Sequence, residues 1–187
     1  MTTLSKTLLL SFLLAVITGS DDRYLKFDPS DEHPHGRPHP DAPPELAQFD
    51  FMIGEFEATD QFLQRDGTWL TSKGVWNASY FLNGLGIQDR YENQQFVTSN
   101  IRIFDPDASV WKVTFFKMPG YASGVWEGKK EGDRMVMRQF NERPDGTQAE
   151  SRLTFFDITE EGYEWQSENI VDGQSLVTWK SSCRRVK

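Results

Sequence analysis

Apolar and polar positions alternate along most of the chain after residue 48. The alternation is clearest in Trp111–Phe115 and Met135–Phe140. A period of two indicates strands with one packed face and one wetter face. Short turn signals such as Arg65-Asp66-Gly67 and Glu161-Gly162 separate these segments, which favours antiparallel hairpins over βαβ units.

The turns divide the chain into ten predicted strands with no helix among them. A curled sheet that closes on itself leaves no vulnerable edge. We therefore expect an all-β, up-and-down antiparallel barrel of about 8–10 strands, and we place its first strand at the aromatic stretch Phe49–Ala58. The predicted strands are 49–62, 68–82, 86–94, 98–105, 110–118, 121–128, 134–141, 147–158, 163–171 and 174–184.

The residues before this domain fall into two segments. Residues 1–20 hold the apolar run Leu8–Ile17 and a single charged side chain, Lys6, which is typical of a secretory signal peptide cleaved after Ser20. A buried N-terminal helix is the alternative. Residues 21–46 contain most of the prolines and all three histidines, so we expect an extended, disordered leader. Residues 47–187 form the barrel domain.

Composition and charge exclude several classes of protein. The 187 residues include no stretch of 18 apolar ones, which argues against a membrane-spanning helix. Loss of Lys6 with the signal peptide leaves 19 basic and 28 acidic residues, a net charge of −9, which disfavours nucleic acid as a partner. Cys183 is the only cysteine, so no internal disulfide forms. We expect a half-buried strand residue, with a reactive free thiol as the alternative.

The histidines of the leader are the candidate metal ligands. His33, His35 and His39 lie close together in sequence beside acidic residues, a spacing that can chelate zinc, copper or nickel. A flexible segment must become ordered before it binds a metal, so we interpret the tract as a linker. We expect no bound cofactor.

The opening stretch Phe49–Phe56 resembles the first strand of a large, mostly uncharacterised family of exported bacterial domains in the lipocalin-like, or calycin, superfamily. Further matches follow in the same order and extend the resemblance over nearly all of residues 49–187. It implies a barrel and says little about function. The matches are Leu82-Asn83-Gly84-Leu85-Gly86 with Asp89, Ile101-Arg102-Ile103-Phe104-Asp105-Pro106, Trp111, Gly124, Gly128, Trp165, Asp172-Gly173 and Trp179.

The resemblance also implies how the base of the barrel is closed. Lipocalin-like barrels carry Gly-x-Trp in the first strand, and a cation from the last strand packs over the indole. Here the triplet is Gly54-Glu55-Phe56, so phenylalanine replaces tryptophan, and Arg184 or Arg185 is the expected cation. Such a contact is weaker over Phe than over Trp. Nitrobindin-like barrels are similar in opening sequence and hold haem through a barrel histidine, but this chain has no histidine after His39.

The chain is rich in aromatic residues, with 14 Phe, 6 Trp and 5 Tyr. A barrel of about ten strands can hold a small apolar ligand, whereas eight strands are nearly filled by side chains. The rings therefore either line a cavity for a fatty acid, isoprenoid, sterol or aromatic metabolite, or simply fill the core. The residues expected toward the inside or its mouth are Trp76, Tyr80, Trp111, Phe115, Trp126, Met137, Phe155 and Trp165.

Arginines within apolar strands are candidates for the polar part of a site. Arg90, Arg102, Arg138 and Arg152 occupy such positions. An inward guanidinium needs a carboxylate or a ligand anion, because an unpaired buried charge is strongly destabilising. We expect these side chains to face solvent, with Arg90 as the exception and the polar anchor of a ligand, because it follows a glycine-rich turn.

No catalytic motif of the common hydrolase, phosphate-binding or metalloprotease kinds is found. The groups left for proton transfer are Asp89, Glu92, Glu127, Tyr80 and Tyr91. The leading hypothesis is a secreted or periplasmic barrel that binds a small apolar or amphipathic molecule without catalysis. One alternative is an isomerase, cyclase or lyase with a buried carboxylate. Another is a filled barrel that acts through its outer surface as an envelope interaction protein.

Overall fold

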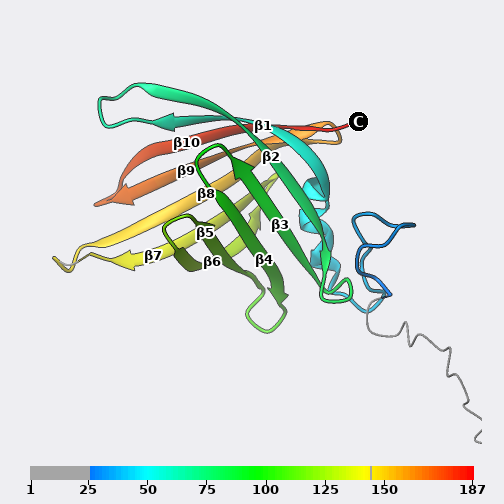
Figure 1. Ribbon diagram of the computed structural model, residues 1–187. Helices are drawn as coiled ribbons and strands as arrows, with labels where there is room; N and C mark the ends of the chain where they lie inside the picture. Colours follow the sequence, from blue (N-terminus) through cyan, green and yellow to red (C-terminus); the bar gives the residue numbers. More distant parts are fainter. Residues whose placement is uncertain (1–25, 144) are drawn as a thin grey trace, which may run out of the picture.

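The computed structural model describes residues 26–143 and 145–187, and the predicted signal peptide lies outside them. Ten strands follow a 3₁₀ helix and curve around a common interior (Figure 1). No helix in the described residues is long and apolar enough to cross a membrane. The elements are η2 (Pro44–Met52), β1 (Gly54–Leu63), β2 (Trp69–Phe81), β3 (Gly86–Asn93), β4 (Val97–Asp105), β5 (Val110–Met118), β6 (Ala122–Glu131), β7 (Arg134–Glu142), β8 (Gln148–Thr159), β9 (Gly162–Val171) and β10 (Gln174–Arg185).

Each strand pairs antiparallel with its neighbours in sequence, and β1 also pairs with β10. The closing register places Phe56 opposite Arg185 and Phe62 opposite Trp179. Every strand therefore has a partner on both sides, which removes the edges of an open sheet. The predicted up-and-down antiparallel barrel is confirmed.

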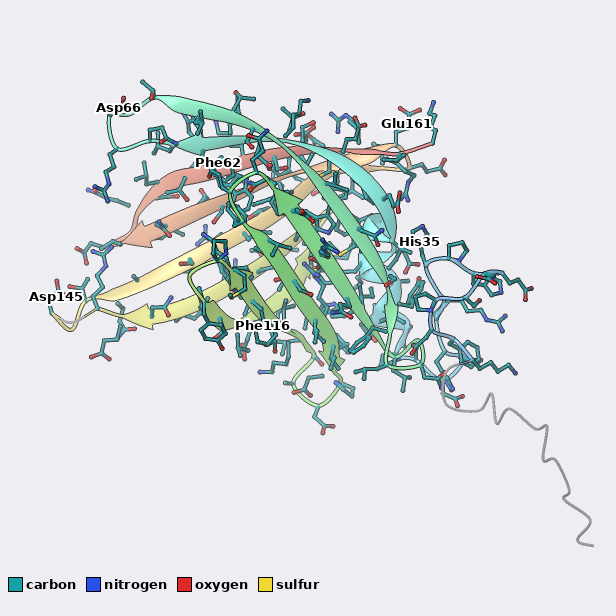
Figure 2. The ribbon with its side chains drawn as sticks, viewed as in Figure 1. His35, Phe62, Asp66, Phe116, Asp145 and Glu161 are labelled. Atoms are coloured by element: carbon teal, nitrogen blue, oxygen red, sulfur yellow. The ribbon has the colours of Figure 1, made fainter. Side chains whose placement is uncertain are left out.

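The two ends of the barrel are built differently. One end, which we call the hairpin end, carries the turns from β1 to β2, β3 to β4, β5 to β6, β7 to β8 and β9 to β10. Figure 2 labels Asp66 and Asp145 at two of these tips. The opposite end carries η2 and the described part of the leader, and Figure 2 labels His35 and Glu161 there. We call it the plug end.

The opening stretch is not the strand that we predicted. Residues 49–52 belong to η2, and β1 begins at Gly54. Pro44 lies at the start of the helix, where its fixed φ is favourable. Leu46, Phe49 and Met52 recur every three residues, the period of a 3₁₀ helix, and all three are buried. The alternation rule missed this spacing, and η2 plugs the barrel instead of extending its wall.

The arginine that closes the barrel base is Arg185. Its guanidinium lies 4.5 Å from the centre of the Phe56 ring. It also donates hydrogen bonds to the carbonyl oxygens of Ile53 at 2.6 Å, Phe51 at 3.2 Å and Glu160 at 2.9 Å. The same side chain therefore ties the end of η2 and the β8–β9 turn to the first strand.

The described part of the predicted leader packs against the β2–β3 turn and is not an extended solvated segment. The Tyr80 N–H donates to the His35 carbonyl at 2.9 Å, and the His39 N–H donates to the Gly84 carbonyl at 2.9 Å. Gly84 has φ +77°, and a Cβ there would collide with the Arg37 carbonyl oxygen. Glycine therefore lets the leader approach the turn closely, a contact that the prolines gave no reason to expect.

Candidate functional site

A cavity of about 140 Å³ lies inside the barrel. Strands β2 to β10 all contribute to its wall. An apolar cavity of about this size can hold a molecule such as benzene, so the interior is largely filled but not closed to ligands. Six of the residues predicted to line a cavity do so: Trp76, Phe115, Trp126, Met137, Phe155 and Trp165.

Two other predicted residues are buried but hold the plug and do not line the cavity. The Tyr80 hydroxyl donates to Asp50 at 2.7 Å, and Trp111 Nε1 donates to Gln48 Oε1 at 3.1 Å. Burial and the hydrogen bond to Asp50 raise the pKa of Tyr80. Both side chains therefore use their polar tips to hold η2 on the barrel.

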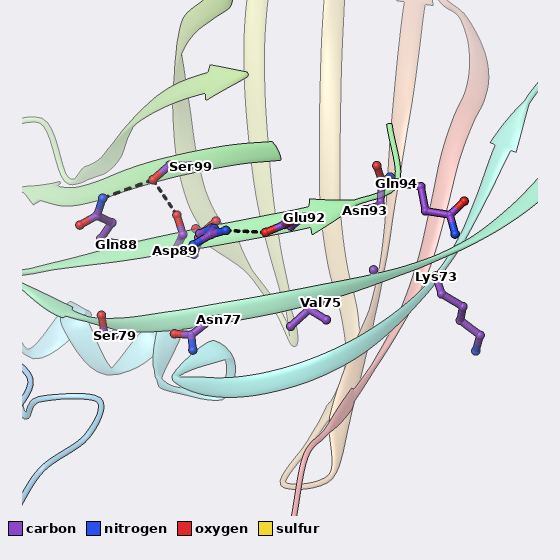
Figure 3. A pocket seen from close by; sticks show the side chains of 12 residues that line it. Lys73, Val75, Asn77, Ser79, Gln88, Asp89, Glu92, Asn93, Gln94 and Ser99 are labelled. Carbon is purple, nitrogen blue, oxygen red and sulfur yellow. Dashed lines mark hydrogen bonds and ion pairs between the residues drawn. The ribbon is translucent and has the colours of Figure 1, made fainter. Parts of the chain in front are cut away.

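The structure places Arg90 on the outer face of β3, so the predicted polar anchor is wrong. Its side chain forms an ion pair with Glu92, two residues along the same strand. Both residues line a polar groove of about 1000 Å³ on the outside of β2, β3 and β4 (Figure 3). Side chains alternate between the two faces of a strand. Arg90 therefore points outward, because its neighbours Asp89 and Tyr91 are buried in the interior.

Arg102 is the arginine of the interior. It is only 3% exposed, forms an ion pair with the buried Asp89 and lies 5.2 Å from the centre of the Phe49 ring. Asn100 Nδ2 donates to Asp89 Oδ1 at 2.8 Å. Burial lowers the pKa of Arg102 to about 9, which still leaves the guanidinium protonated at neutral pH. Arg102, paired with the buried Asp89, therefore forms part of the cavity wall.

Three N–H groups of residues in the cavity wall have no hydrogen-bond partner among the described residues. They are Trp76 Nε1, Trp165 Nε1 and Arg102 Nε. A buried donor without a partner costs about 1–3 kcal/mol. An acceptor oxygen brought into the cavity would remove this cost, so the site favours a ligand with a carbonyl or carboxylate group.

A second polar cluster surrounds Asp60, which is fully buried at an inward position of β1. Its carboxylate accepts hydrogen bonds from the Tyr91 hydroxyl and, at 3.0 Å, from Trp179 Nε1. Asn93 Nδ2 donates to the Tyr91 oxygen at 3.0 Å. Sequence reasoning missed Asp60. It lies two residues after Ala58 and four after Phe56 on the buried face of β1, and this alternation was a usable signal.

The groups considered for proton transfer are poorly placed for it. Glu92 and Glu127 are exposed and paired with Arg90 and Lys112. Burial raises the pKa of Tyr91, as does its hydrogen bond to Asp60, whereas an effective acid or base titrates near the working pH.

Asp89 lies inside but faces Arg102 and Asn100. Its oxygens are therefore engaged as acceptors within the protein. This arrangement favours a binding site over an acid–base site.

Cys183 is fully buried on β10. Burial raises the pKa of its thiol to about 11, so the thiolate is scarce at neutral pH and the side chain is inert. The sequence predicted a half-buried strand residue, and the structure buries it completely.

The histidines do not form a metal site in the structure. No group of three or more His, Cys, Asp or Glu side chains in the described residues is arranged to hold an ion. His39 Nδ1 accepts a hydrogen bond from the Asp41 N–H at 3.1 Å, and His33 Nε2 lies 3.8 Å from Glu32 Oε1. These contacts are local to the leader.

The fold and the interior define a closed ten-stranded antiparallel barrel with a small, mainly apolar cavity. No protein-family model matches the chain, and no curated protein matches it. Among solved structures, it is similar to the S-type phycobiliprotein lyase CPES from Guillardia theta, with a TM-score of 0.47 and 16% sequence identity. The similarity covers 75% of this chain and 92% of that chain, and at this level it carries no inference about ligand or activity.

Proposed function

We propose that the barrel binds a small amphipathic molecule non-covalently. The apolar part lies among the rings of the cavity, and a carboxylate or carbonyl oxygen accepts hydrogen bonds from Trp76 Nε1 or Arg102 Nε. The observation that carries this proposal is the set of three N–H groups, on Trp76, Trp165 and Arg102, that have no partner among the described residues and belong to the wall of a cavity of about 140 Å³. The pattern of residues 1–20 supports a secreted or periplasmic location for this binding.

The first test uses hexanoate as the probe, because its chain is short enough for the cavity and its carboxylate offers two acceptors. Trp76→Phe keeps most of the ring and removes the donor. Loss of a hydrogen bond to a charged group is worth about 1.5–3 kcal/mol, so we expect affinity to fall at least tenfold by isothermal titration calorimetry. Trp111→Phe is the matched control, since Trp111 is equally buried but its N–H is bonded to Gln48.

The outcomes separate the hypotheses. Equal losses in Trp76→Phe and Trp111→Phe would assign the effect to general destabilisation and remove Trp76 from the site. No binding of hexanoate by the parent protein would reject an acid-binding cavity. In that case native mass spectrometry, before and after organic extraction, decides between another ligand, seen as a releasable extra mass, and a filled barrel that acts through its surface.

A further inference from the structure

The ladder between β6 and β7 stops well before either strand ends. It runs from the Glu131–Arg134 pair only as far as Glu127–Arg138. β6 nevertheless begins at Ala122 and β7 continues to Glu142, each still paired with its other neighbour. Residues 122–126 and 139–142 therefore lie next to each other in the barrel order without a ladder. We call this unpaired stretch the seam.

The seam has no counterpart elsewhere in the barrel. Every other ladder runs to within one residue of the end of one of its two strands. A single side chain crosses the seam, with Gln139 Nε2 donating to the Val125 carbonyl at 3.3 Å. A Cβ on Gly124 would collide with the same amide. Opening the seam would therefore break one side-chain hydrogen bond and no ladder bond.

The seam borders the cavity, whereas the plug end and the side of the barrel opposite the seam are obstructed. Phe49 and the rest of η2 block the plug end. Toward the hairpin end, the rings of Phe62, Phe96 and Trp179 lie together with centroids 4.8–6.1 Å apart, and Lys117 Nζ lies 4.5 Å from the centre of the Phe96 ring. These rings come from β1, β10 and the β3–β4 turn, which is the side away from the seam.

On the seam side, two residues of the cavity wall lie in or near the unpaired stretch. Trp126 is the last unpaired residue of β6, and Met137 lies on β7 two residues before its unpaired stretch begins. On the outside, Val125 and Phe140 flank the seam and are 57% and 67% exposed. Apolar side chains therefore lie on both the inner and the outer face of the barrel wall at the seam.

We infer that the seam is a subsite for the apolar chain of the ligand. The inference rests on the proposed function, because it assumes a carboxylate or carbonyl head inside the cavity. A cavity of about 140 Å³ is filled by a group about as large as benzene, so a longer chain must leave it. The chain passes between β6 and β7 and lies against Val125 and Phe140. The ligand class is an unbranched acid or related carbonyl compound that is longer than the cavity.

The test compares hexanoate with dodecanoate, each below its micelle concentration, by isothermal titration calorimetry. In the parent protein we expect dodecanoate to bind more tightly, because each buried CH₂ contributes about 0.8 kcal/mol. In the variant Val125→Ser/Phe140→Ser, dodecanoate affinity falls about tenfold and hexanoate affinity stays within about twofold. The matched control is Val75→Ser/Ile103→Ser, since both residues are exposed on the outer faces of β2 and β4, and neither strand is next to β6 or β7.

A second variant tests the route itself. Gly124→Val adds bulk at the inner side of the seam, where only the flexible end of Gln139 must move. This variant should bind dodecanoate more weakly than the parent protein does and should bind hexanoate as tightly as the parent does. The seam subsite alone is overturned if the parent protein binds hexanoate tightly but binds dodecanoate no more tightly. It is also overturned if the increase in affinity from hexanoate to dodecanoate is the same in all variants. Failure of both acids to bind the parent overturns the proposed function instead, so the two failures are distinguishable.

Discussion

The plug end and the hairpin end of this barrel are packed in opposite ways. At the plug end Phe49 and Met52 are fully buried, and Arg185 hydrogen-bonds three backbone carbonyls. Toward the hairpin end the β6–β7 ladder is missing, and Val125 and Phe140 are exposed. The comparison teaches that dense packing and an incomplete ladder are separated along the barrel axis, and dense packing resists the local opening that the proposed seam subsite requires.

The largest contrast is expected from removing a phenyl ring at each end. Phe49→Ala should lower the free energy of unfolding by about 3–5 kcal/mol, because it leaves a cavity beneath η2. Phe140→Ala, at an exposed position, should change it by less than about 0.5 kcal/mol. Urea unfolding followed by tryptophan fluorescence measures both. Similar losses in the two variants would contradict the division between the ends.

Two adjacent arginines sharpen the comparison within the plug end. Arg185→Ala removes three hydrogen bonds and the contact with Phe56, and it should cost about 2–3 kcal/mol. Arg184→Ala removes a more exposed ion pair with Glu164 and should cost less than about 1 kcal/mol. The same unfolding measurement applies. A larger loss for Arg184 would show that the closing contact is misassigned.

Two glycines with similar backbone angles test the packing of the leader. Gly84 at the plug end has φ +77°, and Gly146 at the hairpin end has φ +82°. Alanine is disfavoured by both angles, by about 1 kcal/mol, but only at position 84 would its Cβ meet the Arg37 and His39 backbone. Gly84→Ala should therefore cost about 1–2 kcal/mol more than Gly146→Ala, and amide exchange of the leader should rise in that variant alone.

The smallest effect expected is a pH dependence at the plug end. Burial raises the pKa of Cys183 from 9.0 to about 11, so between these values the unfolded chain releases a proton that the folded protein keeps. The unfolded state then binds fewer protons, and stability falls as pH rises. At pH 10 the loss from this thiol is about 1.4 kcal/mol. Tyr80 and Tyr163, whose pKa values are also raised by burial, add to the fall.

Replacing Cys183 with alanine isolates its share of this dependence. The decrease in unfolding free energy from pH 8 to pH 10 should become smaller by about 1.4 kcal/mol. Tyr121→Phe, at the exposed β5–β6 tip, is the control and should leave the decrease unchanged. If the unfolding free energy of Cys183→Ala decreases from pH 8 to pH 10 by as much as that of the parent protein, the buried thiol does not contribute.

Much of the candidate site was predictable because it depends on alternation. Trp76, Met137 and Trp165 were placed inward from their strands, and each lines the cavity. The choice of arginine was not predictable in the same way. Arg90 and Arg102 both lie in apolar strands, and only the register of β3 against β4 decides that Asp89 and Arg102 share the interior.

The sequence by itself determined the strands, their antiparallel order and the aromatic interior, because turn residues and a period of two are local signals. Only the tertiary structure decided that residues 49–52 form a plug and that Asp60 is paired inside. It also decided that the β6–β7 ladder stops early. These features depend on which side chains meet across the closed barrel, and contacts between residues distant in sequence leave no local pattern.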